Sequence, residues 1–334
     1  MQSLATTGDY LRALSRQDRS AAIDVATRAA DARTSVASVI EQVLAPAQAE
    51  IGVLTQRDHW SVADEHAATA ITEVVLGVLA LRQPAPVPRP APVVVTTPAG
   101  EWHGMAARMV AESLRSRGWD ALFLGGDLPD DHLRRFLDRT RPAALLLSCT
   151  MAGALPQLTR SVDAATDAEV PTIVGGLACG PDEHRARAVG ANAWASDAET
   201  AHALLSKWID EDVAPPVARR ARIPAGYLEV VGHRTELTDR LAAAADPSER
   251  SVEGPPLWAR QVAAELVDVL AASLLVDDPR LVESHVDWLT EMLAARGLPS
   301  GTVPAMLDAL RQAVAGIPDA RRLMRRAGPQ PFGT

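Results

Sequence analysis

The chain has few cysteines, no long apolar run and no excess of positive charge, and each of these features would define a class of protein. It holds only 2 cysteines in 334 residues, so we expect no disulfide framework and a reducing, cytoplasmic location. It has no apolar run near the roughly 18 residues that cross a bilayer, and its N-terminus lacks a signal-peptide pattern. Its net charge is -9, without the basic patch that nucleic acids require. We therefore expect neither a membrane nor a DNA partner.

The spacing of apolar residues divides the sequence into two helical ends and a mixed middle. Residues 1–82 predict a four-helix bundle, and residues 83–92 predict a Pro-rich linker. Residues 93–210 alternate short apolar runs with helical segments. This alternation predicts an α/β domain of the flavodoxin-like class, with a doubly wound, five-stranded parallel sheet. Residues 211–223 form a second linker, and residues 224–328 predict an all-helical C-terminal domain.

Local signals predict some of the helix boundaries. Ser61 is a good N-cap, and Asp64 stands where a capping box needs its acidic residue. Pro46 interrupts a helical pattern over residues 35–56 and predicts a kink there. In the C-terminal region, residues 227–244 read as one continuous helix.

His103 is the candidate around which the site is built. It follows a predicted strand over residues 93–97, so it is expected on a loop at the carboxyl edge of the sheet. Ligands of open α/β sheets bind in the crevice at that edge. Glu101 lies two residues earlier, where a carboxylate can hold the imidazole in one tautomer. Taken alone, the same spacing also fits a surface histidine that caps a helix.

Two later strands end in further candidates. A predicted strand over residues 143–147 leads into Ser148, Cys149 and Thr150, and a strand over residues 172–174 leads into Gly175 and Gly176. This set resembles the cobalamin-binding Rossmann-like domain, whose usual pattern is Asp-x-His-x-x-Gly, then Ser-x-Leu or Ser-x-Thr, then Gly-Gly.

The resemblance implies a cobalamin site in this domain. By that likeness, His103 is the lower axial ligand of cobalt, in place of the cofactor's own dimethylbenzimidazole. The displaced nucleotide tail would lie beside Ser148, Thr150 and the two glycines, where glycine permits the backbone to approach a ligand closely.

The loop around the histidine departs from the family pattern at two places. Glu101 stands for the usual Asp and keeps the carboxylate, whereas Ala106 stands for the usual Gly and narrows the space near the tail. Trp102 and Gly104 flank the histidine and complete the predicted binding loop.

A pair of residues in the bundle extends the resemblance. Glu65 and His66, followed by Thr69, resemble the cap that covers the upper face of the corrin in light-sensing cobalamin repressors and in corrinoid methyl-transfer proteins. The implied role is contact with the cofactor. The alternative is an ordinary exposed pair on a helix.

One feature of the light-sensing cap is replaced in this sequence. Those repressors carry a Trp-His pair ahead of the Glu-His pair, where Thr55 and Gln56 stand here. The aromatic lid and the second imidazole are thus missing from their usual place. His59 and Trp60 lie nearer to the fourth helix and are the candidates to substitute.

The C-terminal region contains aromatic and cationic residues but no catalytic grouping. An extra helical domain after a cap and a cobalamin domain resembles the photocobilins, which combine cobalamin with biliverdin. Apolar walls with Arg or His would suit a flat dicarboxylate such as a bilin. A plain dimerisation domain is the alternative. The predicted bilin contacts are Trp258, Arg260, His285 and Trp288.

Three functions are weighed from these features. The first is a light sensor that binds adenosylcobalamin, is not an enzyme, and signals by changing its homo-oligomeric assembly. The second is a corrinoid shuttle of a methyltransferase system, which usually lacks such a C-terminal region. The third is a helical interaction protein with a decayed pocket, against which the complete His103, Ser148 and Gly175-Gly176 set argues. The sensor is the preferred interpretation.

Overall fold

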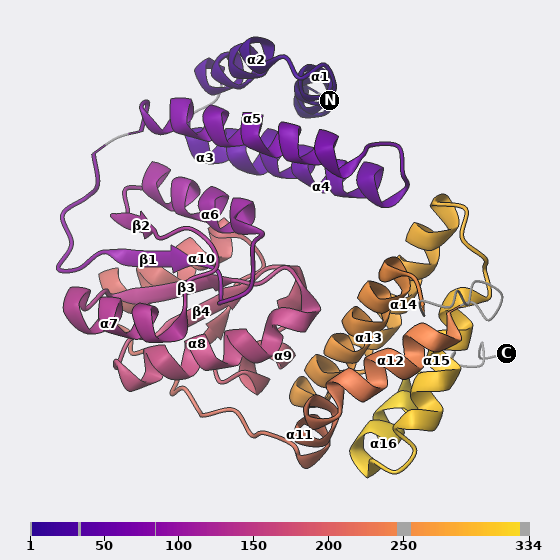
Figure 1. Cartoon of the computed structure of the whole chain (residues 1–334). Coiled ribbons are helices and arrows are strands. Elements are labelled where there is room, and N and C mark those ends of the chain that lie inside the picture. The colour runs from indigo at the N-terminus through magenta and orange to yellow at the C-terminus, as the bar shows by residue number, and fades with distance from the viewer. Residues whose placement is uncertain (1, 33–34, 84, 246–254, 328–334) are drawn as a thin grey trace, which may run out of the picture.

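The computed structural model describes residues 2–32, 35–83, 85–245 and 255–327. Figure 1 shows three parts: an N-terminal helical cap, an α/β sheet domain, and a C-terminal helical domain that lies beside both. In the described parts of the chain, no helix combines the length and apolarity needed to span a membrane.

The cap consists of helices that pack on a core of Ala, Val, Ile and Leu side chains. The capping box predicted at Ser61 is confirmed, because Ser61 Oγ accepts from Asp64 N and the Asp64 carboxylate accepts from Ser61 N at 3.0 Å. The irregularity expected at Pro46 takes the form of a π-helical turn just before it. The elements are α1 (Gln2–Ser15), α2 (Arg19–Asp31), α3 (Val36–Val39), η1 (Ile40–Leu44), α4 (Ala45–Gln56) and α5 (Val62–Ala80).

The middle of the chain forms the predicted five-stranded parallel sheet, in the order β2-β1-β3-β4-β5. This is the flavodoxin-like order, so the predicted fold class is confirmed. The order reverses at β1, which places the loops after β1 and β3 side by side at the topological switch point. The strands are β1 (Val93–Thr96), β2 (Ala121–Phe123), β3 (Ala144–Ser148), β4 (Thr172–Gly175) and β5 (Ala193–Trp194).

Helices cover both faces of the sheet, because alternate strand residues point to opposite sides. On one face, Val93 and Val95 pack with α6 (Gly104–Ser116) and α10 (Ala198–Leu205). On the other face, Val94 packs with α7 (Asp130–Thr140), α8 (Leu155–Asp167) and α9 (His184–Ala188). The cap lies on the outer side of α6, whose Met109 belongs to the cap's core.

The C-terminal region is helical, as predicted. One boundary was wrong: residues 227–244 form two helices rather than one, and the break falls at His233 next to Gly232. The helices are α11 (Ala225–Gly232), α12 (Arg234–Ala244), α13 (Leu257–Val276), α14 (Arg280–Ala295), α15 (Thr302–Ala313) and α16 (Pro318–Arg326).

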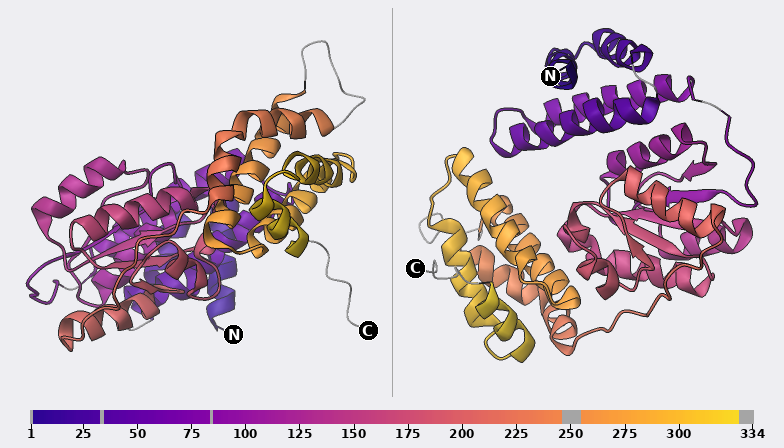
Figure 2. Two further views of the ribbon diagram at one scale, coloured as in Figure 1. Left: turned by 90° about the horizontal axis from the view of Figure 1, so that it is seen from below. Right: turned by 180° about the vertical axis from the view of Figure 1, so that it is seen from behind.

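The C-terminal domain has different contacts with the other two parts. Its apolar core is continuous with the α7–α9 side of the sheet domain, and α13 packs directly on α8 and α9. Its contact with the cap is made by α14 against α4, where Gln56 Nε2 donates to Glu291 Oε2 at 3.1 Å. Figure 2 shows from two further sides that this domain stands next to both the sheet and the cap.

Candidate functional site

His103 lies where the sequence placed it, on the loop between β1 and α6. It is the residue before the first turn of α6, and its side chain is 55% exposed. Its Nδ1 lies 2.5 Å from Glu101 Oε1. Because a carboxylate only accepts, Nδ1 carries the hydrogen, and Nε2 keeps the lone pair that can bind a metal. The predicted role of Glu101 in fixing the tautomer therefore has the geometry it needs.

Glu101 connects the two loops at the switch point. Its side chain is fully buried, and Oε1 also accepts from His103 N at 3.1 Å. Its other oxygen, Oε2, accepts from the backbone N–H groups of Thr150 at 2.9 Å and Met151 at 2.8 Å. One buried carboxylate thus joins the loop after β1 to the loop after β3. The sequence did not predict this second pair of hydrogen bonds.

The charges of the Glu101 carboxylate and the His103 imidazole stabilise each other. Burial opposes ionisation of Glu101, but the hydrogen bonds from His103 and Met151 outweigh it and hold its pKa below the usual value. The hydrogen bond to Glu101 raises the pKa of His103, burial lowers it, and the charges of Glu101 and Glu65 raise it further. The charge of a carboxylate on cap helix α5 therefore acts on this imidazole.

The predicted tail-binding residues lie along the next two strand ends. Ser148 is buried and pairs in register with Gly175. A Cβ on Gly175 would come within 2.6 Å of Ala195 O, and one on Gly176 within 2.4 Å of Cys149 O. Gly176 also has a φ of +92°, which side chains rarely adopt. The glycines are thus required by the packing of the protein's own backbone, besides any approach to a ligand.

Exposed apolar side chains lie on the loops that follow β1, β3 and β4, and the sequence analysis missed two of them. Trp102 is 78% exposed beside His103. Leu177, directly after Gly176, is 82% exposed, and Met151 after β3 is also exposed. Both residues could have been found from the sequence, because each is an apolar residue shortly after a predicted strand. Together they offer an apolar surface at the edge of the sheet where ligands bind.

The cap residues have different environments. Glu65 is half-buried, whereas His66 is exposed on α5. Thr69 Oγ1 lies 3.5 Å from Gln48 Oε1, which is the limit of a hydrogen bond. Trp60 packs against the core of the cap, and His59 is exposed on the loop before α5. Of the predicted cap contacts, Glu65 is the one whose charge acts on His103.

The four predicted bilin contacts have different neighbours. His285 and Trp288 stack on α14, with ring centroids 5.7 Å apart and an interplanar angle of 16°. Arg260 instead pairs with Asp239 of α12 at 3.2 Å, and Trp258 packs against the large core. The guanidinium of Arg260 is thus paired with a carboxylate on the neighbouring helix, and its contact with a bilin stays a prediction.

His285 lies at the seam with the sheet domain. It lines a cavity of about 200 Å³ together with Gly100 and Met151, which belong to the two loops joined by Glu101. Its Nε2 is buried and has no hydrogen-bond partner in the described part of the chain. Burial lowers the pKa of His285 to about 4. The α14 histidine is thus a neutral side chain next to the switch-point loops.

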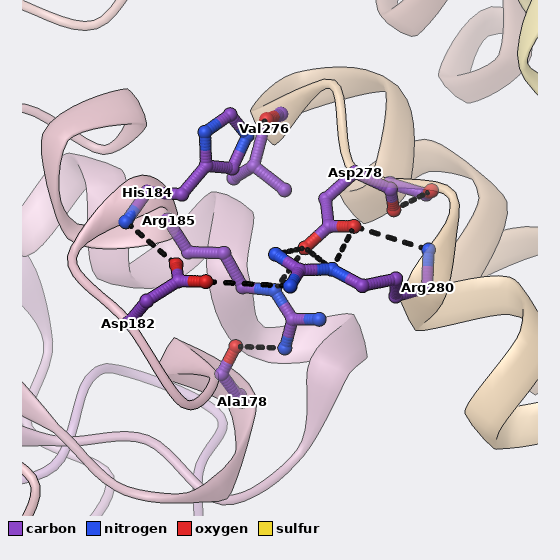
Figure 3. A network of polar contacts seen from close by, with 8 residues as sticks. Ala178, Asp182, His184, Arg185, Val276, Asp278 and Arg280 are labelled. Atoms are coloured by element: carbon purple, nitrogen blue, oxygen red, sulfur yellow. Dashed lines mark hydrogen bonds and ion pairs between the residues drawn. The ribbon is translucent and has the colours of Figure 1, made fainter.

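A buried ion pair fixes the C-terminal domain to the loop that follows the glycines. Arg185 Nε of α9 donates to Asp278 Oδ2 at 2.8 Å, and Arg185 Nη1 donates to Ala178 O at 3.0 Å. Arg280 holds the same carboxylate from the other side, with Nη2 2.9 Å from Oδ2. Figure 3 shows this network between α9 and the turn before α14. It links the Gly175–Gly180 loop to the C-terminal helices.

Both cysteines are free and buried beside this loop. Burial raises the pKa of Cys179 to about 12 and that of Cys149 well above its usual value. Cys149 O accepts from Ala178 N at 3.1 Å, so the two cysteine-bearing loops are also hydrogen-bonded to each other.

We expect the Glu101→Gln variant to bind cobalamin about 10–100-fold more weakly, the usual effect of losing a carboxylate that orients a metal-bound histidine. An amide has nearly the size of the carboxylate but carries no negative charge. Its NH2 group also cannot accept a hydrogen bond, so some of the N–H groups that donate to Glu101 would lose their acceptor. Absorbance titration with hydroxocobalamin measures the affinity. Glu112→Gln is the matched control, because Glu112 is also buried but pairs with Arg115 on α6. Equal affinities of the two variants would contradict this role of Glu101.

Comparison with known proteins agrees with this geometry. Residues 91–205 match the model of the B12 binding domain, and residues 8–80 match a second model of a B12 binding domain. The two matches cover the sheet domain and most of the cap, and they support cobalamin as a ligand of this chain. No curated protein matches the chain significantly.

Solved structures resemble the same region. A monomethylamine corrinoid protein from Methanosarcina barkeri is 16% identical and aligns over 58% of this chain and 94% of its own, with a TM-score of 0.50. A cobalamin-binding protein from Desulfitobacterium hafniense is 19% identical over 61% of this chain and 98% of its own, with a TM-score of 0.34. The first of these likenesses supports the fold of the cap and sheet domain.

Proposed function

We propose that this cobalamin-binding protein is a light sensor that holds adenosylcobalamin between His103 and the helical cap. The observation that supports it most is the position of the C-terminal domain. This domain joins the sheet through the buried Arg185–Asp278 pair and touches the cap through polar groups such as the half-buried Gln56 and the exposed Glu291. A displacement of the cap would therefore break weak contacts at α14 and leave the strong contacts to the sheet in place.

The chain's own residues have distinct parts in this proposal. His103 Nε2 would bind cobalt from below, in the neutral form that metal binding requires. Glu101 orients the imidazole and accepts its Nδ1–H. Trp102, Met151 and Leu177 cover the apolar edge of the corrin, and Ser148, Thr150 and Gly175-Gly176 hold the tail. Adenosylcobalamin supplies a cobalt–carbon bond that light can cleave.

Output is proposed to run through self-association rather than catalysis. When the upper face of the site changes, α5 and α4 shift, and α4 separates from α14. Surface of α14 that includes Trp288, already partly exposed, becomes available to a second copy of the chain. Biliverdin is the proposed second chromophore, stacked beside His285 and Trp288, where the two rings are nearly parallel.

The test combines spectra with measurements of size. The full chain, reconstituted with adenosylcobalamin, should change its absorption spectrum and its elution volume in size-exclusion chromatography after green light. His103→Ala should fold normally and shift the cofactor's spectrum in the dark, because the lower ligand changes. His132→Ala serves as the control, since His132 is an exposed histidine on α7 with no predicted contact to the cofactor. An unchanged spectrum in His103→Ala would refute the assignment of the ligand.

A second candidate function is that of a corrinoid carrier in methyl transfer. The likeness of fold to the monomethylamine corrinoid protein favours it. A carrier loaded with methylcobalamin should transfer its methyl group to an acceptor in the presence of a methyltransferase, with no change of assembly on illumination. Titration with biliverdin separates the alternatives further, since a carrier should produce no red-shifted bilin band. Loss of that band in Trp288→Ala would support the proposed stacking.

A further inference from the structure

A second cavity, of about 640 Å³, lies between α9, the linker after Pro216, and the ends of α13 and α16. Its volume falls within the roughly 300–1,000 Å³ of ligand pockets. Its lining residues do not belong to the loops that carry His103, Ser148 or Gly176. In Figure 1 the linker runs past the lower edge of the sheet domain to α11. The lining of this cavity shares no residue with the predicted cobalamin site.

Five arginines and two aspartates line the cavity, although the chain as a whole has a net charge of -9. Its two carboxylates are already engaged: Asp277 pairs with Arg326 at 2.8 Å, and Asp319 pairs with Arg322 at 3.1 Å. Positive charge therefore dominates the space that remains. The lining arginines are Arg187, Arg219, Arg220, Arg222 and Arg322.

Two of these arginines are free to bind a ligand. Within the described ranges of the chain, Arg219 and Arg222 form no ion pair and no side-chain hydrogen bond, and both are exposed. A guanidinium keeps its charge at any physiological pH and presents its N–H groups as a fork that fits carboxylate and phosphate. Their neighbour Arg220 is occupied by Asp167, and Arg187 by Glu183.

The backbone that carries the two free arginines is fixed against the sheet domain. Asn192 Nδ2 donates to Pro216 O at 2.7 Å. A Cβ added to Gly190 would come within 2.4 Å of Arg219 O, so the linker packs tightly against the turn before β5. Because the linker is held at these points, the two guanidinium groups start from a defined position beside the cavity.

The remaining wall is apolar. Ile223 of the linker, Leu275 of α13 and Leu323 of α16 line it. The geometry points to a binding site for a small organic anion that carries two or more negative charges, as phosphate or carboxylate, on an apolar body. The arginines would bind the charged end, and the leucines and isoleucine would cover the apolar body.

The test is isothermal titration of the cobalamin-loaded full chain with pyrophosphate, citrate and phenyl phosphate. At least one of them should bind, and more weakly in 200 mM than in 50 mM salt, because ionic strength screens exposed charges. The double variant Arg219→Ala, Arg222→Ala should lower the affinity about 100-fold or more, the effect of two lost charged hydrogen bonds. Arg57→Ala, at an exposed arginine in the cap, should bind like the wild type.

The pattern across the three probes identifies the charged group. Binding of pyrophosphate without citrate indicates phosphate, binding of citrate alone indicates carboxylate, and a preference for phenyl phosphate over pyrophosphate indicates use of the apolar wall. Each of these results supports the site if the double variant no longer binds the probe while its affinity for cobalamin stays unchanged. Failure of all three probes at millimolar concentration, or equal binding by the double variant, would overturn the proposal.

Discussion

Replacing Asp278 with alanine should lower the free energy of unfolding by about 3–5 kcal/mol, the usual cost of breaking a buried ion pair from one side. The side chains of Arg185 and Asp278 are only 7% and 3% exposed. Burial opposes the charge of Asp278, but hydrogen bonds from Arg280 and Arg185 outweigh it and lower its pKa to about 2. Without the carboxylate, the Arg185 guanidinium would remain buried next to α13 with no counter-charge.

Denaturation in guanidinium chloride, followed by circular dichroism, measures the loss. Asp308→Ala is the matched control, because Asp308 pairs with Arg311 on the exposed surface of α15, where a pair contributes about 0–1 kcal/mol. The double variant Arg185→Met, Asp278→Leu should recover most of the stability, since apolar residues of similar volume can replace a buried pair. A loss no greater than that of Asp308→Ala would show that the pair does not hold the domains together.

Acidification from pH 7 to pH 5 should destabilise the wild type by about 2 kcal/mol more than His285→Leu, given about 1.36 kcal/mol per pKa unit. The pKa of His285 falls from 6.5 when unfolded to about 4 in the fold, because burial excludes the charged form. Between these values the unfolded chain takes up a proton that the folded chain does not. The contribution of neutral His285 to the free energy of unfolding is therefore fully present above pH 6.5 and is lost as the pH falls towards 4.

Parallel denaturation curves at the two pH values give this difference directly. His132→Leu is the control, because it replaces a histidine that is exposed on α7 rather than buried. If His285→Leu retained the full acid sensitivity of the wild type, His285 would not be the buried neutral group that the stacked arrangement with Trp288 indicates.

The parts of the fold that the sequence predicted are those that follow from local pattern. Apolar runs of four or five residues, each followed by a helical segment, are enough to predict a parallel sheet and its order. His103 and Glu101 are two residues apart, so their contact could also be inferred. The capping box at Ser61 is equally local, and it was confirmed.

The parts that the sequence did not predict depend on contacts between distant residues. Arg185 and Asp278 are 93 residues apart, and nothing near either one signals a buried pair. Glu101 reaches Thr150 and Met151 through their backbone N–H groups, which every residue except proline has. Arg260 was predicted as a bilin contact, and no local pattern in the sequence signals the ion pair that it forms with Asp239 of α12.

The two buried thiols, Cys149 and Cys179, do not react with alkylating reagents while the loops that carry them are closed. Cys149 and Cys179 have raised pKa values, so almost no thiolate exists at neutral pH, and neither sulfur is open to solvent. An alkylating reagent can therefore react only in the rare molecules whose loops have parted. The rate of alkylation of Cys149 and Cys179 thus measures how often the Gly175–Gly180 segment separates from the loop after β3. No label has to be introduced for this measurement.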